Sequence, residues 1–287
     1  MTDQLLSIGG ITLALRCDDA RVDCRFVEPF SRFVVEEGSP DIELHVTLHE
    51  EELASRGSLV FDSGAVWKLL RDGDGHRIEC KTPPLGDTPY RVATIDSSFT
   101  RGEVHVRPNL GGHPLNYPLD EVLFANLLGR GRGVELHGCG IVARDGRGHL
   151  FVGQSGAGKT TTAGLWGDDA ADVVSDDRVI VRVVDEQPVM FGTPWHGEAQ
   201  HASAAPSRLD GIYLLAQSPA NELRTLTESE AVARLFACSF PLFYDPNALA
   251  FTVDYFQKLV RRVPVRELRF TRDRAAVDLV MAEPHAA

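Results

Sequence analysis

The chain has 287 residues, which at roughly 150 residues per domain predicts about two domains. With 43% hydrophobic and 24% charged residues, it has the composition of an ordinary globular protein that can bury a sizeable core. The 41 acidic and 29 basic residues give a formal charge of -12, which argues against an extended phosphate-binding surface for DNA or RNA. The five cysteines form no C-x-x-C pair, and we see no basic leader and no long apolar run, so we expect a cytoplasmic protein without disulfides, export signal or membrane span.

The N-terminal part of the chain is expected to be rich in β-strands. Residues 42–48 alternate apolar and polar side chains, which is the pattern of a half-buried strand. Two hairpins are predicted where strand pairs flank polar turns, one from residues 67–70 and 76–80 and the other from residues 90–95 and 103–107. We predict a meander of antiparallel strands with one helix over residues 22–34.

A turn-rich segment over residues 108–118 follows. It predicts a boundary between a β-rich N-terminal domain, residues 1–108, and a second domain, residues 109–287. A helix is expected to begin at Pro118, because proline is favoured in the first turn of a helix, and to end before Gly129.

Strands and helices alternate in the rest of the chain, which indicates an α/β domain. Strands are predicted over residues 134–143, 149–152, 172–175, 179–184 and 189–191. Helices are predicted over residues 159–166, 248–262 and 273–281, and the capping-box pattern Thr227-Glu-Ser-Glu230 predicts a further helix start.

The segment Gly153-Gln-Ser-Gly-Ala-Gly-Lys-Thr160 fits the P-loop (Walker A) pattern G-x-x-x-x-G-K-[ST] and lies between a predicted strand and a predicted helix. Its glycines permit backbone conformations that direct amide groups at phosphate oxygens, and the helix N-terminus adds partial positive charge. Lys159 is expected to contact the outer phosphates of ATP, and the Thr160 hydroxyl to bind Mg²⁺. The residues expected to bind the nucleotide are Gly153, Gln154, Ser155, Gly156, Ala157, Gly158, Lys159, Thr160 and Thr161.

Two adjacent aspartates, Asp176 and Asp177, follow a predicted strand a short distance beyond Lys159. Carboxylates at the end of a strand that neighbours a phosphate-binding loop are in a position to bind Mg²⁺. Adjacent side chains on an extended backbone point apart, so we expect one aspartate to bind the metal and the other to accept a proton from an attacking hydroxyl. The residues do not say which aspartate does which, and an Asx turn that only closes the strand is the alternative.

Residues 137–181 resemble the catalytic domain of bacterial HPr kinase/phosphorylase and, more weakly, ATP-dependent phosphoenolpyruvate carboxykinase. The resemblance is carried by His137-Gly-Cys-Gly, by the P-loop segment followed by Thr161, and by Ser175-Asp-Asp-Arg-Val179. It implies an ATP- and Mg²⁺-dependent kinase domain in which Lys159, the two aspartates and His137 line the reaction centre.

The Gly-Arg-Asn signature of true HPr kinases is absent after Leu209. The layout is more similar to HPr-kinase-related proteins such as lasso-peptide precursor kinases, a resemblance carried by the segments Pro118-Leu-Asp-Glu, Gly133-Val-Glu-Leu-His137 and Gly192-Thr-Pro-Trp195. That resemblance implies a serine acceptor on a peptide or small protein. We expect the β-rich N-terminal domain to recognise this acceptor, because exposed strand edges can accept an extended peptide by strand addition. Two alternatives stay open, a nucleotide-binding regulatory switch without transfer and a small-molecule kinase. No nucleic-acid or membrane partner is expected, and the oligomeric state is left open.

Two weaker candidates lie near this segment. The loop over residues 192–198 carries His196 and Glu198, which would contact the acceptor or the nucleotide unless the loop serves packing alone. Cys139 follows closely after His137, and we expect a buried packing residue rather than a nucleophile.

Overall fold

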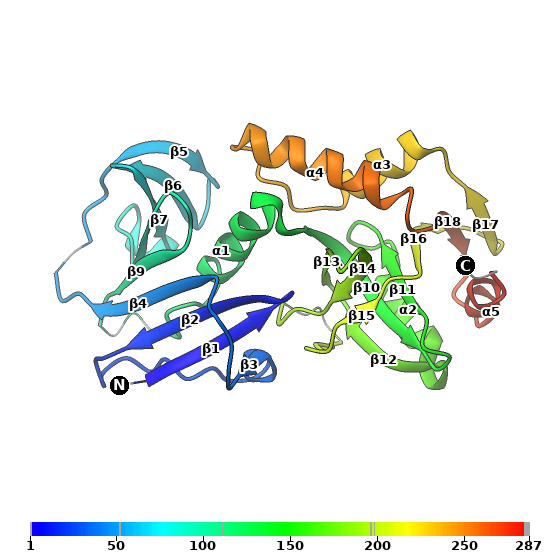
Figure 1. The fold of residues 1–287 in the computed structure, drawn as a ribbon, viewed down its shortest axis with the longest axis horizontal. Helices are drawn as coiled ribbons and strands as arrows, with labels where there is room; N and C mark the ends of the chain where they lie inside the picture. Colours follow the sequence, from blue (N-terminus) through cyan, green and yellow to red (C-terminus); the bar gives the residue numbers. More distant parts are fainter. Residues whose placement is uncertain are drawn as a thin grey trace. The chain divides into compact units, whose positions relative to one another are not determined.

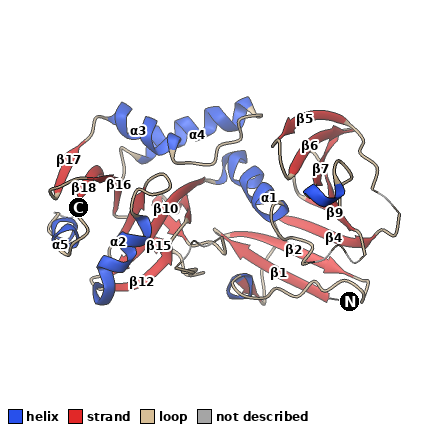
Figure 2. Cartoon of the chain, turned by 180° about the vertical axis from the view of Figure 1, so that it is seen from behind, coloured by secondary structure: helices blue, strands red, loops and turns tan. Residues whose placement is uncertain are grey.

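The computed structural model describes residues 2–51, 53–108, 110, 112–195, 197 and 199–283 (Figures 1 and 2). By its internal contacts the chain divides into two compact units, Met1–Leu127 and Leu128–Ala287. The chain is a mixed α/β protein, and each unit is built on its own β-sheet.

The division falls after helix α1 (Leu119–Leu127), whereas the sequence placed the boundary at residue 108. The buried side chain of Asp120, at the start of this helix, interacts electrostatically with Cys80 and Tyr90 of the first unit. The helix therefore belongs with the N-terminal sheet. In the described ranges, every helix is too short or too polar to cross a membrane.

The described part of the first unit forms a nine-stranded sheet in the order β3-β1-β2-β4-β9-β8-β7-β6-β5. Its strands are β1 (Thr2–Ile8), β2 (Ile11–Cys17), β3 (Val34–Val35), β4 (Ile42–Leu48), β5 (Ser58–Asp62), β6 (Trp67–Asp72), β7 (Gly75–Cys80), β8 (Arg91–Ile95) and β9 (Arg101–Val106). Both predicted hairpins are confirmed, as β6–β7 and β8–β9. The purely antiparallel meander is wrong, because β4 pairs in parallel with both β2 and β9. Parallel neighbours require a long connection, and here β3 lies between β2 and β4 in the chain while β5–β8 lie between β4 and β9.

The predicted helix over residues 22–34 is also wrong. The segment is irregular and contains only a short 3₁₀ turn, Phe30–Phe33. Cys24 and Phe26 are buried with exposed residues on either side of each, so the burial has a period of two and not the helical period. Pro29 also lacks the amide hydrogen that a helix interior requires.

The described part of the second unit also forms a nine-stranded sheet, in the order β15-β14-β13-β10-β11-β16-β18-β17 with β12 paired to β10. Its strands are β10 (Val134–Ala143), β11 (Gly148–Val152), β12 (Ala170–Ser175), β13 (Arg178–Val184), β14 (Gln187–Phe191), β15 (Ser207–Arg208), β16 (Gly211–Gln217), β17 (Glu222–Thr225) and β18 (Val265–Phe270). Its α-helices are α2 (Lys159–Trp166), α3 (Glu228–Ala237), α4 (Pro246–Leu259) and α5 (Ala275–Met281). The strands and helices predicted for this unit are confirmed with small differences at their ends, whereas β15, β16, β17 and β18 lie outside the predicted strand ranges.

Helices cover both faces of the second sheet (Figure 1). On one face, Leu150 of β11 packs in a core with Leu235 of α3 and Phe256 of α4. On the other face, Phe151 packs with Trp166 of α2 and with residues of α5. Because consecutive residues of β11 enter opposite cores, its last three residues, Leu150–Val152, are all apolar, and the polar loop begins where the strand ends.

Candidate functional site

A glycine-rich loop joins the end of β11 to the start of α2. Two of its residues have left-handed backbones, Gly156 with a φ of 80° and Gly158 with a φ of 110°. A Cβ atom at Gly158 would lie 2.7 Å from Cζ of Phe270 on β18. Gln217, at the end of β16, donates a hydrogen bond of 2.8 Å to the carbonyl oxygen of Gly156. Two neighbouring strands therefore support the loop, and its path depends on glycine.

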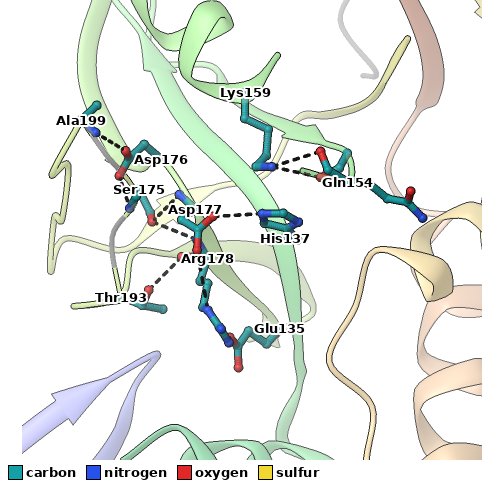
Figure 3. Close-up of polar contacts among 12 residues, drawn as sticks. Glu135, His137, Gln154, Lys159, Ser175, Asp176, Asp177, Arg178, Thr193 and Ala199 are labelled. Carbon is teal, nitrogen blue, oxygen red and sulfur yellow. Dashed lines mark hydrogen bonds and ion pairs between the residues drawn. The ribbon is translucent and has the colours of Figure 1, made fainter. Parts of the chain in front are cut away.

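The residues of this loop differ in exposure. Gln154, Ser155, Gly156 and Thr160 are exposed, Ala157, Gly158 and Thr161 are half-buried, and Gly153 and Lys159 are buried. Lys159 Nζ donates hydrogen bonds to the carbonyl oxygens of Gly153 at 3.2 Å and Gln154 at 3.3 Å (Figure 3). Burial lowers the pKa of Lys159, and the nearby carboxylate of Asp177 acts in the opposite direction. The loop therefore holds a mostly buried ammonium group close to several exposed residues.

His137 and Asp177 meet beside this loop. The imidazole Nε2 of His137, on β10, lies 3.0 Å from Oδ1 of Asp177, which directly precedes β13 (Figure 3). Burial raises the pKa of Asp177, but the hydrogen bond with His137 and the charges of His137, Arg178 and Lys159 together outweigh it and hold the pKa below its ordinary value. The carboxylate is half-exposed and ionised at neutral pH, and can accept a proton or bind a cation.

Asp176 points the other way, as expected for a neighbour on an extended backbone. Its side chain is buried, with the residue 2% exposed, and both carboxylate oxygens accept backbone hydrogen bonds, from Gly197 N at 3.0 Å and Ala199 N at 2.9 Å (Figure 3). A Cβ atom at Gly197 would lie 2.9 Å from Asp176 Oδ2, so the loop and the carboxylate are closely packed. The paired aspartates thus have separate surroundings, one beside His137 and one beneath the loop that follows β14.

The structure adds Glu135, Arg178 and Phe240 to this region, and no sequence pattern predicted Phe240. Arg178 NH1 donates to buried Glu135 at 3.0 Å, and its Nε lies 3.7 Å from Asp177 Oδ2. The guanidinium also lies over the ring of Phe240, 4.2 Å from its centroid. Glu135 is two positions before His137 on a strand and shares its face, which is the signal that sequence reasoning overlooked.

The remaining candidates have plain outcomes. Cys139 is fully buried, which confirms a packing residue, and burial raises the pKa of its thiol. His196 and Glu198 lie outside the described residues. Trp195, in the same loop, is 7% exposed. Within the described ranges, no group of three or more His, Cys, Asp or Glu side chains is arranged to hold a metal ion.

Comparisons with known proteins add a distant structural resemblance. No protein-family model matches the sequence. No curated protein matches it either. Among solved structures, the chain is similar to HPr(Ser) kinase/phosphatase from Coxiella burnetii, with 12% sequence identity and a TM-score of 0.23, over 44% of this chain and 97% of that chain.

Proposed function

We propose that this protein is an ATP-dependent phosphotransferase similar to HPr kinase, which transfers the γ-phosphoryl group of ATP to a serine hydroxyl on a peptide or small protein. One observation supports the proposal: a glycine-rich loop that fits the P-loop pattern adjoins a carboxylate–imidazole pair. The amide of Gly153, where the loop begins, donates a hydrogen bond of 3.2 Å to the carbonyl oxygen of His137. Lys159 of the loop also interacts electrostatically with Asp177, so the ammonium group and the carboxylate lie close together.

In this proposal the glycine-rich loop is a P-loop that binds the phosphates of ATP. The amides of its exposed residues and the N-terminus of α2 would offer hydrogen-bond donors and partial positive charge to phosphate oxygens. The Lys159 ammonium rests on two neutral carbonyl oxygens, and phosphate would give it a charged partner. Binding would thereby offset the cost of burying this cation.

The residues present are compatible with magnesium. Mg²⁺ in phosphotransferases usually takes one or two protein oxygens and completes its shell with substrate phosphates and water. The exposed Thr160 hydroxyl suits that role, whereas both oxygens of Asp176 already accept loop amides. Magnesium held by Thr160 and phosphate oxygens would supply charge neutralisation for the transferred group.

Asp177 is the proposed base. The acceptor oxygen would form a bond to the γ-phosphorus while the bond from that phosphorus to the bridging oxygen breaks and ADP leaves. The proton of the acceptor hydroxyl would pass to the Asp177 carboxylate. His137, hydrogen-bonded to the same carboxylate, would fix its orientation.

A binding assay and a transfer assay test the proposal. Wild-type protein should bind Mg-ATP in isothermal titration, and Lys159→Ala should lose that binding. Lys258→Ala is the matched control, because the Lys258 side chain is 69% exposed and pairs with Asp254. Incubation with γ-labelled ATP and serine peptides should give an acid-stable product.

Three outcomes would contradict the proposal. Unchanged Mg-ATP binding by Lys159→Ala would remove the P-loop assignment. Binding without transfer or hydrolysis would favour the regulatory switch. Acid-labile label on His137 would indicate histidine phosphorylation in place of a serine acceptor.

A further inference from the structure

A short segment after helix α3 lies along β10 directly beside the candidate site. His137 N donates to the carbonyl oxygen of Cys238 at 2.8 Å, and Phe240 N donates to that of Glu135 at 3.2 Å. Leu136 and Ser239 form an antiparallel bridge between these two bonds. The segment therefore occupies the side of β10 where β11 has ended, and its backbone position is fixed by the sheet.

This backbone position brings the Phe240 ring to the polar centre. The ring lies edge-on to the His137 imidazole, with 6.3 Å between centroids, and its face covers the Arg178 guanidinium at 4.2 Å. Phe240 nevertheless remains 37% exposed. The ring is partly exposed and lies against His137, the partner of the proposed base Asp177. It is therefore in a position to contact the molecule that presents its hydroxyl to Asp177.

The charges around the ring favour an apolar contact. Arg178 is paired with Glu135 at 3.0 Å and lies 3.7 Å from Asp177, so the cation under the ring already has two anionic neighbours. A charged acceptor side chain would lose water at this position and gain no opposite charge from the guanidinium. An apolar side chain would instead exchange water for contact with the open part of the ring.

Building on the proposed function, we infer that Phe240 is a specificity-determining residue that contacts an apolar side chain adjacent to the phosphorylated serine. The acceptor class is therefore a peptide segment in which serine has a leucine-like or aromatic neighbour. Its binding, more than the chemical step, depends on this ring. Phe243 offers the matched control, because it is 68% exposed in the following loop and packs edge-on against Phe236.

The test compares initial rates of phosphate transfer for three enzymes and two peptides. The enzymes are wild type, Phe240→Ala and Phe243→Ala; the peptides differ only in carrying leucine or aspartate next to a single serine. We expect wild type to prefer the leucine peptide, and Phe240→Ala to raise its KM about tenfold with little change in kcat. The aspartate peptide should show no such rise, and Phe240→Leu should restore most of the preference because it keeps an apolar side chain.

The outcomes separate this inference from the proposed function. If Phe240→Ala lowers kcat/KM equally for both peptides, or if Phe243→Ala abolishes the preference as strongly, Phe240 does not read the neighbouring residue and the inference fails alone. If wild type binds Mg-ATP but phosphorylates neither peptide nor any other serine acceptor, the proposed function fails and the inference fails with it. Mg-ATP titration of each variant reports whether its nucleotide site is intact.

Discussion

His137 Nε2 lies 3.0 Å from Asp177 Oδ1, and the backbone fixes this contact as well as the side chains do. The register of the sheet pairs His137 with Arg178, and Gly138 N donates to the carbonyl oxygen of Asp177 at 2.9 Å. Strand pairing thus positions both residues before their side chains meet. Conservative changes to the carboxylate should therefore alter its chemistry and leave the fold in place.

Replacement of Asp177 by asparagine tests its proposed role as base. Asparagine keeps the shape and can still contact His137, but it cannot accept a proton, so phosphate transfer should slow by about 100-fold or more. Affinity for Mg-ATP should stay within about threefold, since Lys159 and the loop amides are intact. Radiolabel transfer and isothermal titration measure the two quantities. Normal turnover in this variant would rule out Asp177 as the base.

Replacement of Asp176 by asparagine should act on stability. One of the two loop amides, from Gly197 or Ala199, would then face an NH₂ group in place of an oxygen acceptor. Leaving a buried donor unsatisfied costs about 1–3 kcal/mol, which urea unfolding would detect. Hydrogen exchange at those amides should accelerate. Unchanged stability and exchange would mean that the loop does not depend on this carboxylate.

Replacement of Gly158 by alanine should damage the glycine-rich loop. The new Cβ would lie 2.7 Å from Phe270 Cζ on a backbone with a φ of 110°, so the loop must shift. We expect at least about a tenfold loss of Mg-ATP affinity, because the amides would no longer point at the phosphates. Gly164→Ala is the control, since nothing lies within 4 Å of its Cβ position in α2, and it should raise helix stability by about 0.5–1 kcal/mol. Equal affinities in the two variants would contradict a P-loop.

His149 predicts a specific acid sensitivity. Both ring nitrogens are buried without a hydrogen-bond partner in the described part of the chain, and the ring packs against Trp166 at 5.2 Å and Tyr213 at 5.8 Å. Burial, aided by the charge of Arg147, lowers the pKa of His149 from 6.5 to about 4. Between these values the unfolded chain binds the additional proton, so stability falls as the pH decreases through this window and does not change on this account above it.

The variant His149→Phe removes that proton site and keeps an aromatic ring. Between pH 7 and pH 5, wild type should lose about 2 kcal/mol of its free energy of unfolding through protonation of His149 in the unfolded chain, and the variant should not show this loss. Urea unfolding of both proteins at the two pH values measures this difference. Parallel pH profiles would show that His149 has an ordinary pKa in the folded state.

Most local structure in the second unit, and the composition of the glycine-rich loop, could be predicted from the sequence alone. Loop residues 153–160 follow a strand and precede a helix. Glycine stands at the two loop positions with a left-handed backbone, so the sequence pattern reflects a local conformational requirement. The capping box is another local feature, because Thr227 accepts from Glu230 N and the Glu230 side chain accepts from Thr227 N.

Tertiary structure decided the rest, because the deciding partners are distant in sequence. From the sequence, Asp176 and Asp177 differ only in that adjacent side chains on an extended backbone point to opposite sides. In the structure, the loop amides of Gly197 and Ala199 donate to Asp176, so the two carboxylates have different surroundings. The parallel pairing of β4 with β2 and β9 depends on long connections that leave no local signal. Phe240 becomes part of the site only because β11 ends at Val152 and leaves one side of β10 open for a segment after α3, a relationship that exists only once the sheet has formed.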